Sequence, residues 1–258
     1  MDSHIQIPVW FALLLITICV LWLVQHIVFP TFRWAVRHKA NAVIGEANQK
    51  LALKIPTFKL TKREVLIDRI SYAPEVLQTI ELMATDEQVT REKLMGDVQR
   101  YAKEIVPAFN ALIYFKFGYW VARKLLNSMY RVRLGFSDDE ALTDIEPDTS
   151  VVFIMNHRSN VDYIIATYLA AERTALSYAV GEWARVWPLQ QLIRMMGGYF
   201  VRRNSDNPLY RKVLQTYVQL AADGGIPQAV FPEGRLSRDG IIGEPKLGLL
   251  GYLSLIHI

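Results

Sequence analysis

The feature that most constrains this chain is an apolar run near its beginning, residues 9–29, which reads VWFALLLITICVLWLVQHIVF and carries no formal charge at neutral pH. A helix rises about 1.5 Å per residue, so a helix of this length matches a hydrocarbon core about 30 Å thick. The preceding MDSHIQIP has no basic residue, and no small-x-small cleavage site follows the run, which favours a retained span over a signal peptide or a buried segment. We therefore predict a transmembrane anchor over residues 1–30.

The charges on either side of the run predict its orientation. Only Asp2 precedes it, whereas a series of basic residues follows it: Arg33, Arg37, Lys39, Lys50 and Lys54. Positively charged flanks stay in the cytoplasm. We therefore expect a single N-terminal span with the rest of the chain in the cytoplasm.

The composition is that of a chain with a real core, since 52% of the 258 residues are apolar. The 29 basic and 25 acidic residues are dispersed, and a net charge of +4 does not argue for nucleic acid, so we expect none as a partner. The same small excess suits an anionic membrane surface or a phosphorylated substrate. Cys19 is the only cysteine and lies in the apolar run, which excludes a disulfide framework, a cysteine-based metal site and a thiol nucleophile.

Helical patterns dominate residues 31–135, which we expect to form a membrane-proximal helical region. Residues 31–55 are basic and predict a helix at the membrane surface that ends at Pro56. Helices follow over residues 62–127, with a break at Pro107. The segment FNALIYFKFGYWVARKLL within them fits either an interfacial face against lipid or a core face against the next domain.

Residues 136–150 are polar and turn-rich, which is typical of a linker, and the hydrophobic period changes after them. Short apolar runs (SVVFIMN, ALSYAVG, GGYFVRR and PQAVFPEG) alternate with helical patterns, one of which is EWARVWPLQQLIRMM. This alternation predicts an α/β domain over residues 151–252, with a parallel or mixed sheet flanked by helices. In such sheets ligands bind at the carboxyl ends of the strands, and the polar motifs described next follow predicted strands.

The first motif, NHRSNVDY, places His157 just after a predicted strand and Asp162 five positions later. Residues five apart lie about 140° apart around a helix, so we expect His157 in the turn and Asp162 in the first turn of the next helix. From there the carboxylate can accept from one imidazole nitrogen and leave the other free as a general base. A plain helix start also fits, because Ser159 and Asp162 have capping-box spacing and an acid there suits the helix dipole.

The second motif, GGYFVRR, ends in Arg202 and Arg203. Strand side chains alternate in direction, so we expect only one of the two arginines to enter a given pocket. A guanidinium in that pocket can bind a phosphate in bidentate fashion. A basic strand end that faces solvent or lipid head groups explains the pattern as well.

The third motif, VFPEGRLSRDG, leads from a strand into a loop of charged and small residues. The backbone near Gly234 can approach a ligand closely and the arginines favour an anion, although an ordinary strand-to-loop turn also fits. The candidate binding residues of this motif are Glu233, Gly234, Ser237 and Arg238. Together the three motifs predict one site with a base, a phosphate clamp and a polar loop.

The three motifs resemble those of the membrane-bound glycerol-3-phosphate and lysophosphatidate acyltransferases. NHRSNVDY looks like their His-x4-Asp motif, GGYFVRR like their second block, and FPEGRLSRDG like their third, usually Glu-Gly-x-Arg-Ser. HRSNVDY and the ending SRDG are more similar to the glycerol-3-phosphate branch. In the third block Leu236 stands at the usual arginine position and Arg235 one place earlier, so the resemblance does not carry a binding role onto Arg235.

The resemblance implies acyl transfer from acyl-CoA or acyl-carrier protein to the 1-hydroxyl of glycerol 3-phosphate, at a bacterial inner membrane and without a cofactor or metal. His157 would take the hydroxyl proton, and Asp162 would stabilise the imidazolium. Glu233 and Gly234 would shape the pocket. The candidates for the substrate phosphate share a guanidinium: Arg202, Arg203 and Arg238.

Two other functions stay open. A lysophosphatidate acyltransferase would use the same chemistry on a different acceptor. An inactive membrane-anchored protein that binds lipid or acts as a scaffold would keep the fold without turnover.

The end of the sequence predicts an incomplete domain. The resembled family has a fourth block, an apolar strand with prolines, which nothing here matches. Residues 253–258, LSLIHI, are what a common transposase mosaic-end sequencing adaptor encodes, so we expect them to be non-native. A chain cut at that point is expected to have an unpaired sheet edge and to lose activity.

Overall fold

A computed structural model describes most of the chain and divides it into two compact units, Met1–Val43 and Ile44–Ile258. The described residues are 8–132, 135, 141, 144–146, 149–202, 205–237 and 239–254. Several predicted features lie outside them: most of the linker 136–150, Arg203, Arg238 and residues 255–258 of the predicted non-native tail.

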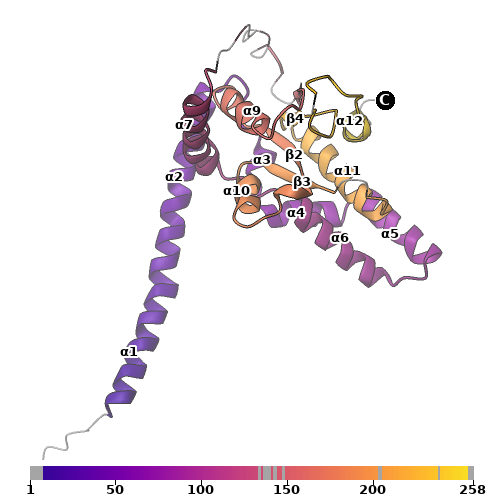
Figure 1. The fold of residues 1–258 in the computed structure, drawn as a ribbon. Coiled ribbons are helices and arrows are strands. Elements are labelled where there is room, and N and C mark those ends of the chain that lie inside the picture. Colours follow the sequence, from indigo (N-terminus) through magenta and orange to yellow (C-terminus); the bar gives the residue numbers. More distant parts are fainter. Residues whose placement is uncertain are drawn as a thin grey trace, which may run out of the picture. The chain divides into compact units, whose positions relative to one another are not determined.

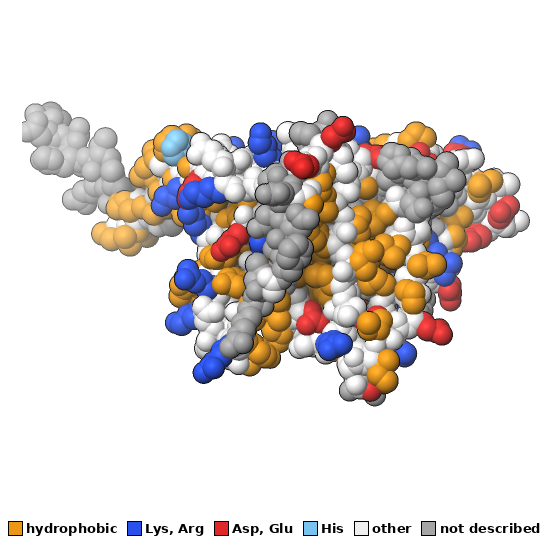
Figure 2. Space-filling model, turned by 90° about the horizontal axis from the view of Figure 1, so that it is seen from above, with side chains coloured by type: hydrophobic (Ala, Val, Ile, Leu, Met, Phe, Trp, Pro, Cys, Tyr) orange, Lys and Arg blue, Asp and Glu red, His pale blue; other side chains and the backbone are white. Residues whose placement is uncertain are grey.

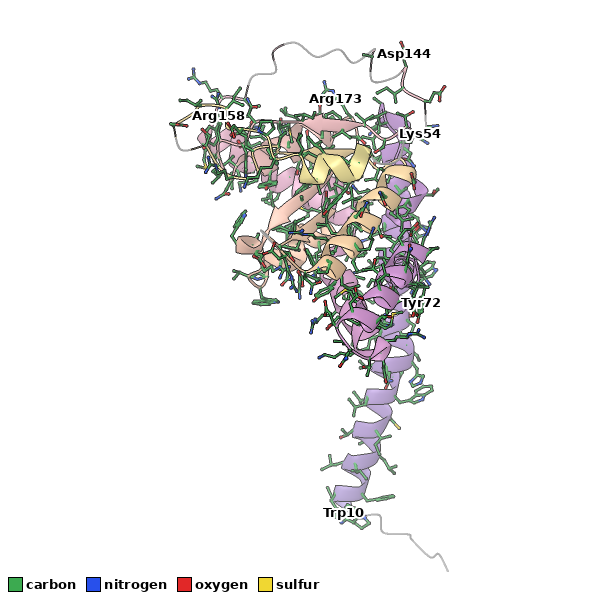
Figure 3. The ribbon with its side chains drawn as sticks, turned by 90° about the vertical axis from the view of Figure 1, so that its right-hand side faces the viewer. Trp10, Lys54, Tyr72, Asp144, Arg158 and Arg173 are labelled. Atoms are coloured by element: carbon green, nitrogen blue, oxygen red, sulfur yellow. The ribbon has the colours of Figure 1, made fainter. Side chains whose placement is uncertain are left out.

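The first unit contains the apolar run in one continuous helix. α1 (Val9–Leu23) passes through a short π-helical turn, η1 (Val24–Val28), into α2 (Phe29–Lys50). Apolar side chains project from it on all sides, among them Trp10 near its start (Figure 3), as is typical of a membrane span. Among the described residues, one helix, Val9–Lys50, is long and apolar enough to cross a membrane.

The basic helix ends before Pro56, the residue at which the sequence predicted its end. α2 stops at Lys50 and not at Pro56. Beyond it the Leu53 N–H donates to the carbonyl of Arg173 (3.0 Å), and the Ile55 N–H donates to the side chain of Asn48 (2.9 Å). These bonds outside a helix satisfy backbone donors that a longer helix would have used.

The second unit is built around a parallel sheet. Within the described residues the sheet has four strands in the order β1-β4-β2-β3, and every neighbouring pair is parallel (Figure 1). The strands are β1 (Val152–Ile154), β2 (Ser177–Gly181), β3 (Gly198–Val201) and β4 (Gln228–Val230). The predicted α/β class is confirmed, and the described pairs are parallel rather than mixed.

A helix follows each of these strands. They are α9 (Asp162–Ala170), α10 (Leu189–Met195), α11 (Pro208–Asp223) and α12 (Gly248–Ser254). The predicted helix EWARVWPLQQLIRMM forms only in its second half, because the segment begins with a 3₁₀ turn, η3 (Glu182–Ala184), and α10 starts after Pro188. The residue before a proline is disfavoured in a helix, which accounts for the gap.

The helices predicted over residues 62–127 are present, with the expected break at Pro107. They are α4 (Arg63–Ser71), α5 (Pro74–Asp86), α6 (Arg91–Ile105), η2 (Ile113–Gly118) and α7 (Tyr119–Met129). A short helix that was not predicted, α3 (Thr57–Leu60), precedes them. On α6 the fully buried Val98, Ala102 and Ile105 recur at helical spacing and face the core shared with α11 and Tyr199 of β3.

Successive strand residues point to opposite faces of the sheet. Tyr178, Val180 and Phe200 pack in the cluster that includes α9, whereas Ala179 and Tyr199 face the cluster of α4, α5, α6 and α11. The helices α4, α5 and α6 thus cover one face of the sheet and belong to the same compact unit as the strands. The linker predicted at residues 136–150 lies mostly outside the described residues and stays a prediction.

The aromatic segment FNALIYFKFGYWVARKLL combines the two readings left open by its pattern. Tyr114, Ala122 and Leu126 are buried, so one face packs in the core. Phe117 and Trp120 are exposed by 48% and 57%, so an apolar face stays accessible.

On the face seen in Figure 2, acidic and basic side chains are interspersed, in line with the dispersed charge of the sequence.

Candidate active site

The predicted motifs meet at the carboxyl edge of the parallel sheet. His157 follows β1, Arg202 follows β3 and Glu233 follows β4. β4 is the neighbour of β1, so the loops that carry His157 and Glu233 lie side by side. β3 is three strands away from β1, which at about 4.8 Å per strand is roughly 14 Å. The second motif therefore reaches the site from its far side.

His157 and Asp162 form the predicted pair. The imidazole Nδ1 of His157 lies 3.2 Å from Oδ2 of Asp162. A carboxylate only accepts hydrogen bonds, so Nδ1 carries a proton, and in a neutral imidazole Nε2 then has the free lone pair. This is the tautomer that a general base requires.

The same carboxylate oxygen organises the turn before α9. Asp162 Oδ2 also accepts from the backbone N–H of Arg158 (2.7 Å) and of Ser159 (2.8 Å), and Ser159 Oγ accepts from the N–H of Val161 (3.2 Å). The bond from the Ser159 N–H is one half of a capping box. The two readings of NHRSNVDY therefore describe one geometry, because the helix start is what holds Asp162 beside His157.

Two aromatic rings fix the plane of the imidazole. The ring of Phe231, the residue after β4, lies 4.4 Å from that of His157, and Tyr163 meets it edge to face at 5.2 Å. Only 5% of the His157 surface is exposed. Sequence reasoning did not select Phe231 or Tyr163 as functional residues, although each lies within a quoted motif, VFPEGRLSRDG and NHRSNVDY.

Glu233 joins the loops that follow β1 and β4. Its Oε1 accepts from the backbone N–H of His157 (3.1 Å), and its Oε2 accepts from the N–H of Gly243 (3.1 Å). These two bonds, that from Gly243 foremost, lower the pKa of the Glu233 carboxyl below its usual value. The carboxylate is buried and fully engaged, so it holds the histidine backbone in place.

Gly234 and Ser237 complete the loop. Gly234 has a φ of +62°, a conformation that glycine adopts without strain, and its N–H donates to the Phe231 carbonyl (3.0 Å). The Ser237 N–H donates to the carbonyl of His157 (2.8 Å). Both peptide groups of His157 are therefore bound by the third motif.

A cavity of about 690 Å³ opens beside His157. Gly234 lines it from the third motif, Arg202 from the second, and Leu249 and Tyr252 from α12. Glu233 and Ser237 line a neighbouring cavity of about 800 Å³ instead. Among the described residues, no group of three or more His, Cys, Asp or Glu side chains is placed to hold a metal ion.

Arg202 lines the cavity, but its guanidinium is already engaged. Nε and Nη2 of Arg202 donate to the two carboxylate oxygens of Glu104, at 2.8 and 2.6 Å. The free phosphate clamp expected from the sequence is therefore an ion pair here, with its partner on α6. Sequence reasoning missed Glu104, which lies outside every motif and would be one helical acid among many.

Three further basic residues line the cavity without having been selected: Arg211, Arg235 and Lys246. Arg211 donates to Asp206 (2.9 Å), whereas the described residues offer Lys246 no carboxylate at ion-pair distance. The backbone of Lys246 is tied to the third motif, because its N–H donates to the carbonyl of Pro232 (2.8 Å). This backbone bond brings Lys246 to the cavity, and no sequence motif predicts that position.

Comparison with known proteins agrees with this geometry. Residues 137–254 match the model of the Acyltransferase family, a stretch that contains all three motifs. The chain is 30% identical over 206 residues to the glycerol-3-phosphate acyltransferase of Ectopseudomonas mendocina. The matched stretch covers 79% of this chain and 24% of the relative. It is 29% identical over 222 residues to that of Aeromonas hydrophila, with 84% and 27% covered. These matches confirm the resemblance, and the chain spans about a quarter of the length of the curated relatives.

Proposed function

We propose that the protein, whose residues 137–254 match the model of the Acyltransferase family, transfers an acyl group to the 1-hydroxyl of glycerol 3-phosphate. The donor in this proposal is acyl-CoA or acyl-carrier protein. The observation that carries it is the bond between His157 Nδ1 and Asp162 Oδ2 beside a cavity with several basic side chains. The names of the relatives favour glycerol 3-phosphate over lysophosphatidate as the acceptor.

In the proposed reaction His157 acts as the base. Nε2 takes the proton of the acceptor hydroxyl as its oxygen bonds to the thioester carbonyl carbon. The carbon–sulfur bond then breaks, and the leaving thiolate takes the proton back from the imidazolium. Asp162 stabilises the imidazolium while it exists and keeps Nδ1 protonated throughout.

The remaining motif residues position His157, shape the cavity or bind the acceptor phosphate in this proposal. Glu233 and Ser237 hold the backbone of His157, and Gly234 leaves room at the cavity wall. The candidates for the acceptor phosphate remain the three arginines of the second and third motifs: Arg202, Arg203 and Arg238. The acyl chain of the donor suits the apolar wall that Leu249 and Tyr252 provide.

We also place the second unit in the cytoplasm, at a bacterial inner membrane. The basic residues that follow the apolar run support this orientation. Both proposed water-soluble substrates are found in the cytoplasm. The apolar helix keeps the enzyme where its lipid product partitions.

Two substitutions test the proposed function in the full protein reconstituted in lipid. His157→Ala removes the base and is expected to abolish measurable transfer of a radiolabelled acyl group to glycerol 3-phosphate. Asp162→Asn can still accept the two backbone N–H bonds but does not stabilise an imidazolium, and it should lower kcat about 10²- to 10⁴-fold with little change in KM.

The assay compares glycerol 3-phosphate with lysophosphatidate, each with acyl-CoA and with acyl-carrier protein. Transfer that survives His157→Ala contradicts the assignment of the base. Transfer to lysophosphatidate alone replaces the proposed acceptor. A folded wild-type protein that acylates neither acceptor indicates a binding or scaffold role.

A further inference from the structure

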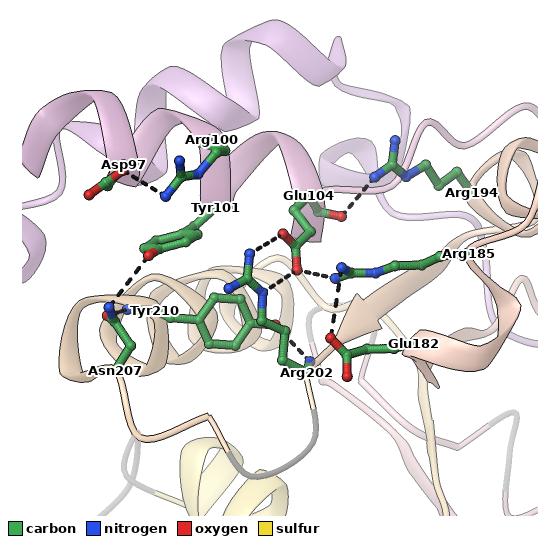
Figure 4. Close-up of polar contacts among 10 residues, drawn as sticks. All are labelled: Asp97, Arg100, Tyr101, Glu104, Glu182, Arg185, Arg194, Arg202, Asn207 and Tyr210. Atoms are coloured by element: carbon green, nitrogen blue, oxygen red, sulfur yellow. Dashed lines mark hydrogen bonds and ion pairs between the residues drawn. The ribbon is translucent and has the colours of Figure 1, made fainter. Parts of the chain in front are cut away.

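One carboxylate, Glu104, holds two arginines at the rim of the candidate site (Figure 4). It lies near the end of α6 and accepts from Arg202 through two parallel bonds, Nε to Oε1 (2.8 Å) and Nη2 to Oε2 (2.6 Å). Arg185, which follows β2, donates to the same Oε1. Arg194 of α10 donates to the backbone carbonyl of Glu104 (3.0 Å).

The carboxylate is ionised in this setting. Its side chain is only 14% exposed, and burial alone would raise the pKa of Glu104. The hydrogen bonds from Arg202 and Arg185 outweigh burial, and the pKa is lowered. Arg185 also lies 3.9 Å from Glu182, Nη1 to Oε1. With Arg194 the cluster therefore has three guanidinium groups and two carboxylates, and its net charge is positive.

Arg202 is held on one edge, and among the described residues no side chain bonds its other edge. Glu104 occupies Nε and one hydrogen of Nη2, and the guanidinium carbon lies 5.0 and 4.9 Å from the rings of Tyr101 and Tyr210. A guanidinium has five N–H donors, so three remain, including both on Nη1. The side chain is 32% exposed and lines the cavity that contains His157.

The backbone of Arg202 is also fixed. Its N–H donates to the hydroxyl of Tyr210 (2.9 Å), and Tyr210 in turn meets Tyr101 edge to face at 5.4 Å. Tyr101 and Glu104 lie one turn apart on α6, so one helix face supplies both an aromatic and a charged contact to this arginine. Rotation of the guanidinium would break the paired bonds to Glu104.

We propose that Glu104 is a positioning residue for substrate: it fixes the guanidinium of Arg202 so that the free N–H edge binds the acceptor phosphate. This inference rests on the proposed function. Glu104 lies on α6, outside residues 137–254 and outside the three motifs. The helical region would then contribute to phosphate binding as well as to the core.

The arrangement fits an anion better than a purely structural ion pair. A pair that only joined α6 to β3 would be neutral and would need one arginine. Here Arg185 and Arg194 add two positive charges around Glu104, and Glu182 adds one negative charge. The positive charge that remains favours an incoming dianionic phosphate. A phosphate on the open edge of Arg202 would gain charge-assisted bonds without displacing Glu104.

The test is a set of variants in the full protein, with the KM for glycerol 3-phosphate and for the acyl donor measured separately. Glu104→Ala frees Arg202 to rotate and should raise the KM for glycerol 3-phosphate about 10- to 100-fold. The KM for the acyl donor should stay within about twofold of wild type. Glu104→Gln keeps one acceptor oxygen and the packing, and should give a smaller rise.

A double-substitution cycle with Arg202→Ala separates positioning from stability. If Glu104 acts through Arg202, the double variant should be no worse in KM for glycerol 3-phosphate than Arg202→Ala alone. Asp97→Ala is the matched control, because it removes another acid of α6, paired with Arg100 at 2.7 Å, and should leave both KM values unchanged. Melting temperatures identify a variant that merely unfolds.

The outcomes distinguish this inference from the proposed function. Wild-type transfer to glycerol 3-phosphate with additive effects of Glu104→Ala and Arg202→Ala, or an equal rise in both KM values, overturns the positioning role alone. A lower KM in Glu104→Gln also overturns it and indicates that the carboxylate competes with the phosphate. No wild-type transfer to glycerol 3-phosphate overturns the proposed function and this inference together.

Discussion

His157 depends on contacts from two other segments of the chain, the start of α9 and the loop after β4. Asp162 orients its ring, Phe231 and Tyr163 pack against that ring, and Glu233 binds its backbone N–H. None of these groups is more than one strand away, because β1 and β4 are neighbours. At the scale of the residue, the position of His157 is therefore fixed by groups that follow the adjacent strands β1 and β4.

The first prediction at the scale of single residues concerns Lys246. Lys246 lines the cavity, and its ammonium has no carboxylate partner among the described residues, whereas Arg202 and Arg211 are each paired with an acid. Lys246→Met keeps the stem beside Gly234 and removes the charge. We expect the KM for glycerol 3-phosphate to rise about tenfold, because a charge-assisted phosphate contact is lost.

The measurement is steady-state kinetics at two salt concentrations. The wild-type KM should rise with salt more steeply than that of the variant, since screening acts on the charge that was removed. Lys93→Met, an exposed lysine of α6 away from the cavity, is the control. An unchanged KM in Lys246→Met would show that this ammonium does not contact the acceptor.

At the scale of elements, Glu233 joins the loops after β1 and β4, and its lowered pKa makes that junction sensitive to acid. A carboxyl whose pKa is lower in the folded state stabilises the fold fully above its unfolded pKa, about 4.3 for glutamate. That contribution is lost as pH falls through the lower folded value. We therefore expect the melting temperature to drop below about pH 4.

Glu233→Gln isolates this contribution. The amide can accept only one of the two N–H bonds, so the variant should melt at a lower temperature than wild type at pH 7. The gap between the two should narrow as pH falls towards 3, because wild type loses the same contacts by protonation. Thermal scans across this range measure it, and a gap that stays constant with pH argues against the prediction.

The helical region and the sheet are joined at both ends of the strands. Near the start of β2 the ammonium of Lys59 donates to the carbonyls of Ala175 and Leu176, at 2.6 and 2.7 Å. Burial lowers the pKa of Lys59 well below its usual value, and the group is accommodated by these acceptors. Near the end of β3, Glu104 binds Arg202. Considered as a whole, the second unit is one body.

Orientation in the membrane is the prediction that belongs to the whole molecule. Cys19→Ser gives a cysteine-free background, since Cys19 is the only cysteine. A cysteine introduced at exposed Lys93 should react with a membrane-impermeant maleimide only after the inner membrane is opened. Labelling in spheroplasts with an intact membrane would place this unit on the outer side.

Local patterns predicted much of the fold. The apolar run, the helical spacing of α4 to α6 and the alternation of strands and helices depend on neighbours in the sequence, so they were recognisable. Pro188 shortened a predicted helix, and α2 ended before Pro56 through bonds to Arg173 and Asn48. The latter bonds join residues that the sequence does not show to be close.

The sequence by itself determined the long apolar helix and the α/β class, because both follow from local patterns. It predicted the pairing of His157 with Asp162 only beside the alternative of a plain helix start. Only the tertiary structure decided which charges surround the site. Glu104 lies 98 residues before Arg202, and Lys246 reaches the cavity through a backbone bond to Pro232. Strand order and helix packing bring such groups together, and no local pattern encodes a contact made across that distance.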